Sequence, residues 1–109
     1  AIAQIETERG LQAVEEIAAV PGIDVLWLGH FDLTNFLGIP GDFADATYRD
    51  GVQRIVAAAR AHKKALGFMS ASPQVAAEYR ALGFNMFAAG TDQAILANGV
   101  AAILAPLRA

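Results

Sequence analysis

Apolar residues follow two alternating patterns along the chain: short continuous runs, and longer stretches in which they recur every three or four positions. The runs are typical of buried strands and the longer stretches of amphipathic helices. The runs predict strands at residues 1–6, 23–28, 65–69 and 85–89. A stretch with helical spacing follows each of them, at residues 8–20, 48–60, 73–82 and 92–107. The pattern therefore predicts four consecutive βα units.

Residues that start and end helices agree with these boundaries. Thr7, Ser72 and either Thr91 or Asp92 stand where an N-cap is expected, and Gly83 stands where a helix should end. Starting or ending a helix is a structural role, so we assign no functional role to any of these residues.

The connection at residues 29–47 is much longer than the about two to six residues of an ordinary βα loop. It contains Gly38, Pro40 and Gly41, and it ends at Thr47, which with Asp50 resembles a capping box. We expect an irregular loop here, and loops of this length are usually functional or mobile.

Four βα units predict an α/β fold with a parallel sheet, because no hairpin signal occurs anywhere in the chain. Two architectures fit: a small open doubly wound sheet, or half of an eight-stranded (β/α)8 barrel. The apolar fraction of 55% is high for a chain of 109 residues, so another surface should cover part of it. This excess favours the half barrel. A flavodoxin-like regulatory domain is weaker, because that fold usually needs a fifth strand.

Composition excludes several classes of function. The net charge of −3 gives no basic footprint for nucleic acid, and the chain has no cysteine for disulfides or thiolate metal sites. No apolar run approaches the roughly 18 to 20 residues of a membrane span. We therefore expect a cytoplasmic protein.

The most informative stretch is the second apolar run, which stops at Gly29 and continues into His30 and Asp32. Glu6 ends the first predicted strand in the same way. The carboxyl ends of parallel strands meet at one edge, where α/β folds bind ligands, so Glu6 and Asp32 should converge. A divalent ion such as Mg²⁺ or Mn²⁺ would relieve the repulsion between two such carboxylates. The alternative is a pair of solvated loop acids.

Four blocks of sequence stand out together: Gln4–Thr7, Gly29–Thr34, Gly67–Met69 and Ala88–Asp92. They resemble the C-terminal half of the HpcH/HpaI aldolase family, a group of metal-dependent class II pyruvate aldolases related to citrate lyase. The resemblance covers essentially the whole chain. It implies the C-terminal half of a (β/α)8 TIM-type barrel, with residues 1–109 as a single domain or fragment.

The resemblance also implies roles for two acids. Glu6 and Asp32 match the family's two protein metal ligands, with Mg²⁺ or Mn²⁺ as the expected ion and Co²⁺ as a further candidate. Pyruvate would complete the metal's ligand set through its keto and carboxylate oxygens. The metal would then stabilise the enolate formed when the carbon–carbon bond of a 4-hydroxy-2-oxo acid breaks.

The substrate-binding residues implied by the resemblance are Gln4, Gly29, Phe31, Asp32 and Met69. The turn around Gly29, Phe31 and Asp32 matches the one whose N–H groups receive the pyruvate carboxylate, Gln4 tunes the metal site, and Met69 lies near the aldehyde portion. Many relatives have Pro-Ala at the two positions that follow Gly29, where this chain has His-Phe.

The family's catalytic histidine and arginine lie in the N-terminal half barrel, which these residues do not include. No catalytic residue is therefore assigned here. His30 could act as a base beside the metal. The commoner alternative is a loop histidine whose side chain is hydrogen-bonded to the backbone.

Taken together, these expectations describe a metal-dependent carbon–carbon lyase that cleaves a 4-hydroxy-2-oxo acid to pyruvate and an aldehyde. It would require an N-terminal half barrel and would form homo-oligomers, with the apolar last helix as a candidate for exchange between subunits. The alternative is a non-catalytic half barrel for assembly or ligand binding. The sequence leaves open which aldehyde, metal and stereochemistry apply.

Overall fold

In the computed structural model, which describes residues 1–70 and 72–108, four parallel strands form one sheet in the order β1-β2-β3-β4. The strands are β1 Ile2–Ile5, β2 Val25–Leu28, β3 Ala65–Ser70 and β4 Met86–Ala89. Each lies within two residues of its predicted range. Consecutive parallel strands joined by right-handed crossovers place all connecting helices on one face of the sheet. This strand order excludes the doubly wound and flavodoxin-like alternatives and confirms the α/β half-barrel prediction.

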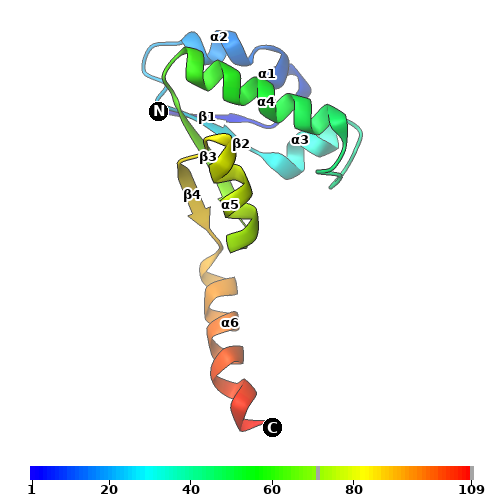
Figure 1. The fold of residues 1–109 in the computed structure, drawn as a ribbon, viewed down its shortest axis with the longest axis vertical. Coiled ribbons are helices and arrows are strands. Elements are labelled where there is room, and N and C mark those ends of the chain that lie inside the picture. The colour runs from blue at the N-terminus through cyan, green and yellow to red at the C-terminus, as the bar shows by residue number, and fades with distance from the viewer. Residues whose placement is uncertain (71, 109) are drawn as a thin grey trace.

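The two faces of the sheet differ in burial, as a half barrel requires. The face toward the helices carries Ile5, Leu26 and Phe68, which are at most 2% exposed. Helices α1, α2 and α4 lie over one side of β1 and β2 (Figure 1). On the opposite face, Met69 and Met86 remain 42% and 40% exposed, and no described helix covers them.

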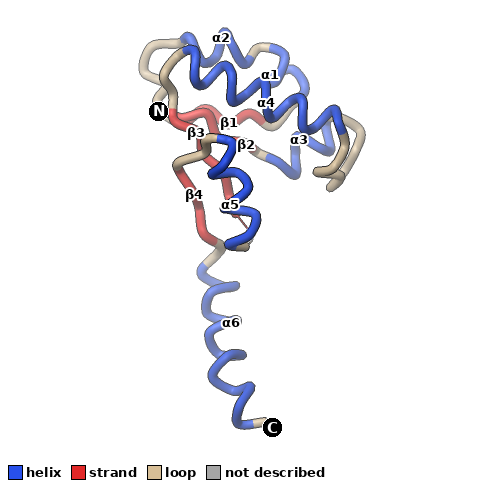
Figure 2. Tube along the Cα trace, viewed as in Figure 1, coloured by secondary structure: helices blue, strands red, loops and turns tan. Residues whose placement is uncertain are grey.

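Seven helical segments connect and follow the strands in the described ranges (Figure 2). They are α1 Glu8–Gln12, α2 Val14–Ala19, α3 His30–Phe36, α4 Ala46–Ala61, α5 Pro73–Leu82, α6 Asp92–Leu104 and the short 3₁₀ helix η1 Ala105–Leu107. The predicted N-caps at Thr7, Ser72 and Thr91 are confirmed, since each side-chain oxygen accepts a backbone N–H of the first turn. None of the helices in this part of the chain is long and apolar enough to cross a bilayer.

Three local predictions were wrong. The helix after Thr7 is broken at Ala13 into α1 and α2, because Ala13 leaves the helical conformation at φ −101°, ψ 14°. The long connection after β2 is not irregular throughout, since its first part forms α3. Finally, α4 is capped by Asp45, whose carboxylate accepts the Thr47 N–H at 2.7 Å, and not by a Thr47 capping box.

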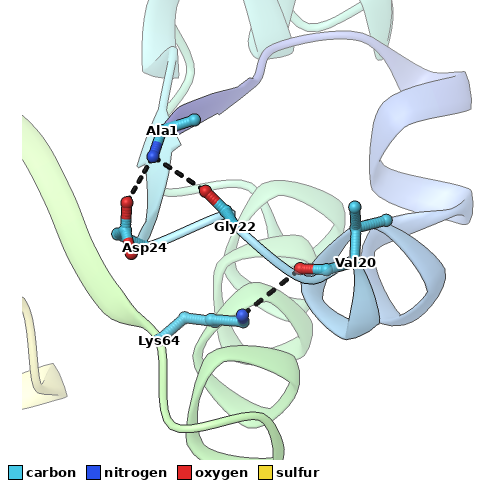
Figure 3. Close-up of polar contacts among 5 residues, drawn as sticks. All are labelled: Ala1, Val20, Gly22, Asp24 and Lys64. Carbon is cyan, nitrogen blue, oxygen red and sulfur yellow. Dashed lines mark hydrogen bonds and ion pairs between the residues drawn. The ribbon is translucent and has the colours of Figure 1, made fainter.

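The end of the sheet where the strands begin is held by a small polar cluster (Figure 3). The amino group of Ala1 donates to the Gly22 carbonyl at 2.8 Å and pairs with the Asp24 carboxylate. Lys64 donates to the Val20 carbonyl at 3.4 Å. The amino group of Ala1 holds the pKa of Asp24 below its usual value, mainly through its hydrogen bond to the Asp24 carboxylate. The chemistry-bearing residues lie at the other end of the strands.

One helix stands apart from the rest. We call the described part of residues 1–89 the body; α6 extends from it as a single arm (Figure 1). No residue of α6 is buried, although the helix is strongly apolar. The body alone therefore contains the hydrophobic core.

Candidate active site at the carboxyl end of the sheet

Gly29 brings the ends of β1 and β2 into close contact. Its N–H donates to the Ile5 carbonyl at 3.0 Å and extends the pairing of the two strands. A Cβ placed on Gly29 would lie 2.6 Å from the Glu6 Cβ and 3.0 Å from both the Glu6 Oε2 and the Gln4 Nε2. Such contacts are too short for any larger residue, so glycine is needed for Gln4 and Glu6 to occupy this position.

The Glu6 carboxylate is held by a neighbouring side chain. The Gln4 Nε2 donates to the Glu6 Oε2 at 2.6 Å. Gln4 is exposed and Glu6 half-buried, so the carboxylate stands at the surface of the site with one oxygen already bonded. Three of the predicted site residues, Gln4, Glu6 and Gly29, are thus together in the structure.

Asp32 lies at the same end of the sheet but in a different environment. It is an exposed residue in the first turn of α3, the helix that begins directly after Gly29. A carboxylate is favoured there by the partial positive charge of a helix N-terminus. No hydrogen bond joins Asp32 to Glu6 in the described residues, so the structure orders one acid firmly and leaves the other free at the surface.

The donor set suits a hard divalent cation. Glu6 and Asp32 offer carboxylate oxygens, and the described residues contain no cluster of three or more His, Cys, Asp or Glu side chains able to hold a metal ion. Magnesium is commonly bound by one or two carboxylates and keeps several waters or substrate oxygens in its shell. Two acids at the same end of the sheet, Glu6 beside Gly29 and Asp32 in the first turn of α3, fit that pattern.

His30 is positioned for packing. Its ring centroid lies 4.6 Å from that of Phe31, 5.4 Å from that of Phe43 and 4.7 Å from that of Phe68. Burial lowers the pKa of His30 and outweighs the Asp32 carboxylate, which acts in the opposite direction. His30 lies within a helix, and its side chain makes no hydrogen bond in the described ranges, so the backbone-bonded loop histidine expected from sequence is replaced by an aromatic cluster.

Phe31 and Met69, the remaining predicted substrate residues, are accessible. Phe31 is 56% exposed on α3, and Met69 lies on the open face of the sheet. Both border a cavity that the sequence did not reveal, and Tyr48 and Tyr79 also line it. Sequence reasoning treated these tyrosines only as apolar helix positions, since no local signal shows that two helices will bring their hydroxyls together.

Comparison with known proteins points in one direction. Residues 1–99 match a family model described as HpcH/HpaI aldolase/citrate lyase. A hydroxypyruvate/pyruvate aldolase of Paraburkholderia phytofirmans is 42% identical over 91 residues, which are 84% of this chain and 35% of that protein. A 4-hydroxy-2-oxovalerate aldolase of Rhodococcus jostii is 35% identical over 104 residues, 95% of this chain and 40% of that protein.

A solved structure gives the same result. An HpcH/HpaI aldolase/citrate lyase family protein from Burkholderia cenocepacia superposes with a TM-score of 0.90 at 31% sequence identity. The match covers 99% of this chain and 42% of that one. The chain therefore spans less than half the length of the proteins it matches.

Proposed function

The chain belongs to the HpcH/HpaI aldolase/citrate lyase family, and we propose that it supplies the metal- and pyruvate-binding half of a (β/α)8 aldolase. The reaction is the reversible cleavage of a 4-hydroxy-2-oxo acid to pyruvate and an aldehyde. The names of the two aldolase relatives support this reaction class. The observation that carries the proposal is the contact of Gln4, Glu6 and Gly29 at the carboxyl end of adjacent strands.

In this proposal Glu6 and Asp32 hold a divalent cation, Mg²⁺, Mn²⁺ or Co²⁺. When bound, such a cation supplies Lewis acidity for the keto oxygen of the substrate. The hydrogen bond from Gln4 restricts rotation of the Glu6 carboxylate, so that its second oxygen keeps one orientation. Gly29 leaves open the space beside that carboxylate which a side chain would fill.

The first turn of α3 is proposed to bind the carboxylate of pyruvate. The N–H groups at the start of a helix have no partner within the helix, and Gly29 offers no side chain to cap them. The N–H groups of Phe31 and Asp32 are therefore available as donors to an anionic oxygen. Met69, on the open face of the sheet, is proposed to contact the aldehyde portion of the substrate.

Two partners complete the proposal. An N-terminal half barrel would cover the open sheet face and pair with the free edges of β1 and β4. By the family resemblance, that half would also carry the residues that transfer protons. The apolar α6 is proposed to pack against another copy of the protein, giving a homo-oligomer. We take residues 1–109 as one structural unit. In this proposal the N-terminal half barrel covers the open sheet face and a second copy covers α6, so this chain itself covers neither surface.

The first test is a titration with Mn²⁺ followed by water-proton relaxation, with and without pyruvate. We expect pyruvate to tighten Mn²⁺ binding. We also expect Glu6→Gln and Asp32→Asn each to weaken that binding by at least about tenfold, the scale seen when metal-site groups are lost. The matched controls are Glu16→Gln and Asp50→Asn, which remove exposed acids on α2 and α4.

Equal losses in the site and control variants would contradict the assignment of the two ligands. Reconstitution with an N-terminal half barrel then tests the reaction itself. Release of pyruvate from a 4-hydroxy-2-oxo acid in the complex supports the aldolase. A complex that binds Mn²⁺ and pyruvate without turnover supports the alternative, a non-catalytic binding module.

A further inference from the structure

The cavity bordered by Phe31 and Met69 is separate from the two carboxylates. It encloses about 400 Å³ among α3, α4, β3, α5 and the loop that precedes α4. Its walls are mostly aromatic and aliphatic, and include Phe31, Phe43, Tyr48, Val52, Phe68 and Tyr79. None of Gln4, Glu6 and Asp32 lines it. Cavities of about 300 to 1,000 Å³ with apolar walls and few polar groups are typical of small-molecule sites.

The aromatic walls of this cavity are ordered by contact with one another. Phe68 and Tyr79 stack with centroids 3.8 Å apart and an interplanar angle of 7°. Phe43 meets Tyr48 edge to face at 5.4 Å and Phe31 in the same way at 5.2 Å. Such walls present ring faces and edges in fixed orientations, and these select for another flat ring.

One hydrogen-bond donor is left over inside the walls. The hydroxyls of Tyr48 and Tyr79 lie 2.5 Å apart, and Tyr48 is only 2% exposed. Each hydroxyl carries one hydrogen, and their mutual bond uses one of the two. Burial raises the pKa of both tyrosines, so both keep their protons at neutral pH. The second hydrogen has no acceptor in the described part of the chain and is available to an occupant.

The charged groups at the rim balance each other. Arg49 and Glu78 both border the cavity and are exposed, and neither takes part in an ion pair within the described ranges. One positive and one negative group give no preference for a charged occupant. A water molecule inside would find few of the two to four polar partners it needs.

We propose that this cavity binds a small neutral aromatic molecule whose ring carries a hydrogen-bond acceptor, such as a carbonyl oxygen. The ring lies among the aromatic side chains, and the acceptor receives the free hydrogen of the Tyr48–Tyr79 pair. The cavity shares Phe31 and Met69 with the residues expected to bind substrate, but it shares none of the acids of that site. It does not depend on the proposed aldolase activity.

The test uses acetophenone as the probe, because a ketone does not form stable imines with lysine as an aldehyde can. Two analogues separate the contributions: ethylbenzene lacks the acceptor, and cyclohexyl methyl ketone lacks the aromatic ring. Binding to the full chain is followed by methyl NMR at Val52, Val75 and Met69, with Val14 as a distant reference. We expect saturable shifts at the three cavity methyls and acetophenone binding about three- to tenfold tighter than either analogue.

Two variants and a control test the location. Tyr48→Phe combined with Tyr79→Phe keeps both rings and removes both hydroxyls, so acetophenone should lose its advantage over ethylbenzene. Val75→Phe fills the cavity from α5 and should abolish binding of both. Ala57→Phe, on an exposed position of α4, should change neither.

The proposal is overturned by either of two results in folded protein. One is the absence of saturable shifts up to the solubility limit of the probe. The other is equal affinity for acetophenone and ethylbenzene before any substitution. Intermolecular NOEs from the acetophenone ring to the Val52 and Val75 methyls locate the probe in the unmodified chain, so the test stands even where Val75→Phe does not fold.

Discussion

Two alanine-rich helices of this molecule have opposite surroundings. Helix α4 carries apolar residues along one face and polar residues along the other, and the apolar face lies buried against the sheet and against α1 and α2. Helix α6 extends away from the sheet (Figure 2) and is apolar on all sides after Asn98, yet none of its residues is buried. Hydropathy alone would have ranked α6 as the more deeply buried helix.

The difference shows what limits burial in this chain. Helix α4 has a sheet beneath it, since it contacts both β2 and β3. Within the described residues α6 makes no comparable contact with a strand, and Ile95, Leu96 and Ile103 are 62%, 70% and 70% exposed. Helices that are apolar all round are normally enclosed, and large exposed apolar patches mark sites of association. The body thus has a buried core of its own, whereas α6 carries exposed apolar side chains of the kind found at association surfaces.

The sharpest test of this contrast replaces the same residue type in both helices. Ile55 in α4 is fully buried and Ile103 in α6 is 70% exposed. We expect Ile55→Ala to reduce the free energy of unfolding by about 2 to 5 kcal/mol, and Ile103→Ala to change it by less than about 0.5 kcal/mol in dilute protein. Urea unfolding at low concentration measures both. Similar losses for the two variants would mean that α6 packs against the body in solution.

Much of the body could be predicted because its signals are local. Each strand is a short apolar run ended by a glycine or a polar residue, and the caps at Thr7, Ser72 and Thr91 are side chains that bond their own first turn. Four βα units without hairpins leave few arrangements. The choice between them needed the strand order, which depends on pairings between distant residues.

The misses have a common physical origin. Helix α3 starts at Gly29, which provides no side-chain cap, so no start signal announces it. It is stabilised instead by tertiary burial, since Leu33 and Thr34 are fully buried and Thr34 accepts the Gly41 N–H. The break at Ala13 is likewise invisible locally, because alanine is a strong helix former.

Part of the candidate site could also be predicted from sequence and part could not. The contact of Glu6 with Gly29 is predictable, since the two residues must be neighbours once β1 and β2 pair in parallel, and Gln4 lies on the same strand as the residues before Glu6. The orientation of the His30 ring is not predictable, because it depends on Phe68 from another strand. The aromatic cavity draws its walls from five separate segments, so no single stretch of sequence carries its pattern.

Charged residues on α6 provide the next test. Leu96→Glu combined with Ile103→Glu places two charges on positions that are exposed in the isolated chain. If these side chains are buried in an assembly, their loss should raise its dissociation constant by at least about a hundredfold, since burying one such side chain contributes about 1.5 to 3 kcal/mol. Sedimentation velocity measures the change, and the unfolding free energy of dilute protein should stay the same.

The control for that experiment is Ala57→Glu combined with Ala61→Glu on exposed positions of α4. It adds the same charge to the chain without touching α6. An equal loss of assembly in the control pair would mean that net charge causes the effect, and would contradict the proposal that α6 forms the contact between copies. An unmodified chain that sediments at 11.4 kDa at every concentration would also contradict it.

Replacing one glycine in the body and one in α6 should change the free energy of unfolding in opposite directions and by smaller amounts. Gly83 ends α5 at φ +114°, a conformation that costs an alanine about 1 to 2 kcal/mol, so Gly83→Ala should destabilise the body by that amount. Gly99 lies within α6, where an added Cβ meets nothing within 4 Å. Gly99→Ala should therefore raise the helix content of α6, with a gain of up to about 1 kcal/mol. Circular dichroism during urea titration follows both, and weaker assembly of Gly99→Ala would indicate close packing at that point.

The smallest expected effect concerns an ion pair within the body. Arg54 of α4 contacts Glu15 of α2 at 2.8 Å, and the hydrogen bond from its guanidinium is the main cause that lowers the pKa of Glu15 to about 2 from 4.5. Because the folded pKa lies below the unfolded one, the pair stabilises the fold fully above about pH 4.5 and loses this contribution as the pH falls toward 2. The gap in Tm between the unmodified chain and Glu15→Gln should therefore be small at pH 7, since both side chains are exposed to solvent, and should narrow further below pH 4.5. The control is Glu16→Gln, which removes an exposed acid that has no ion pair in the described ranges, and it should show no such narrowing of the Tm difference. A Tm difference for Glu15→Gln that does not change with pH would mean that the pair stabilises the fold through packing and not through charge.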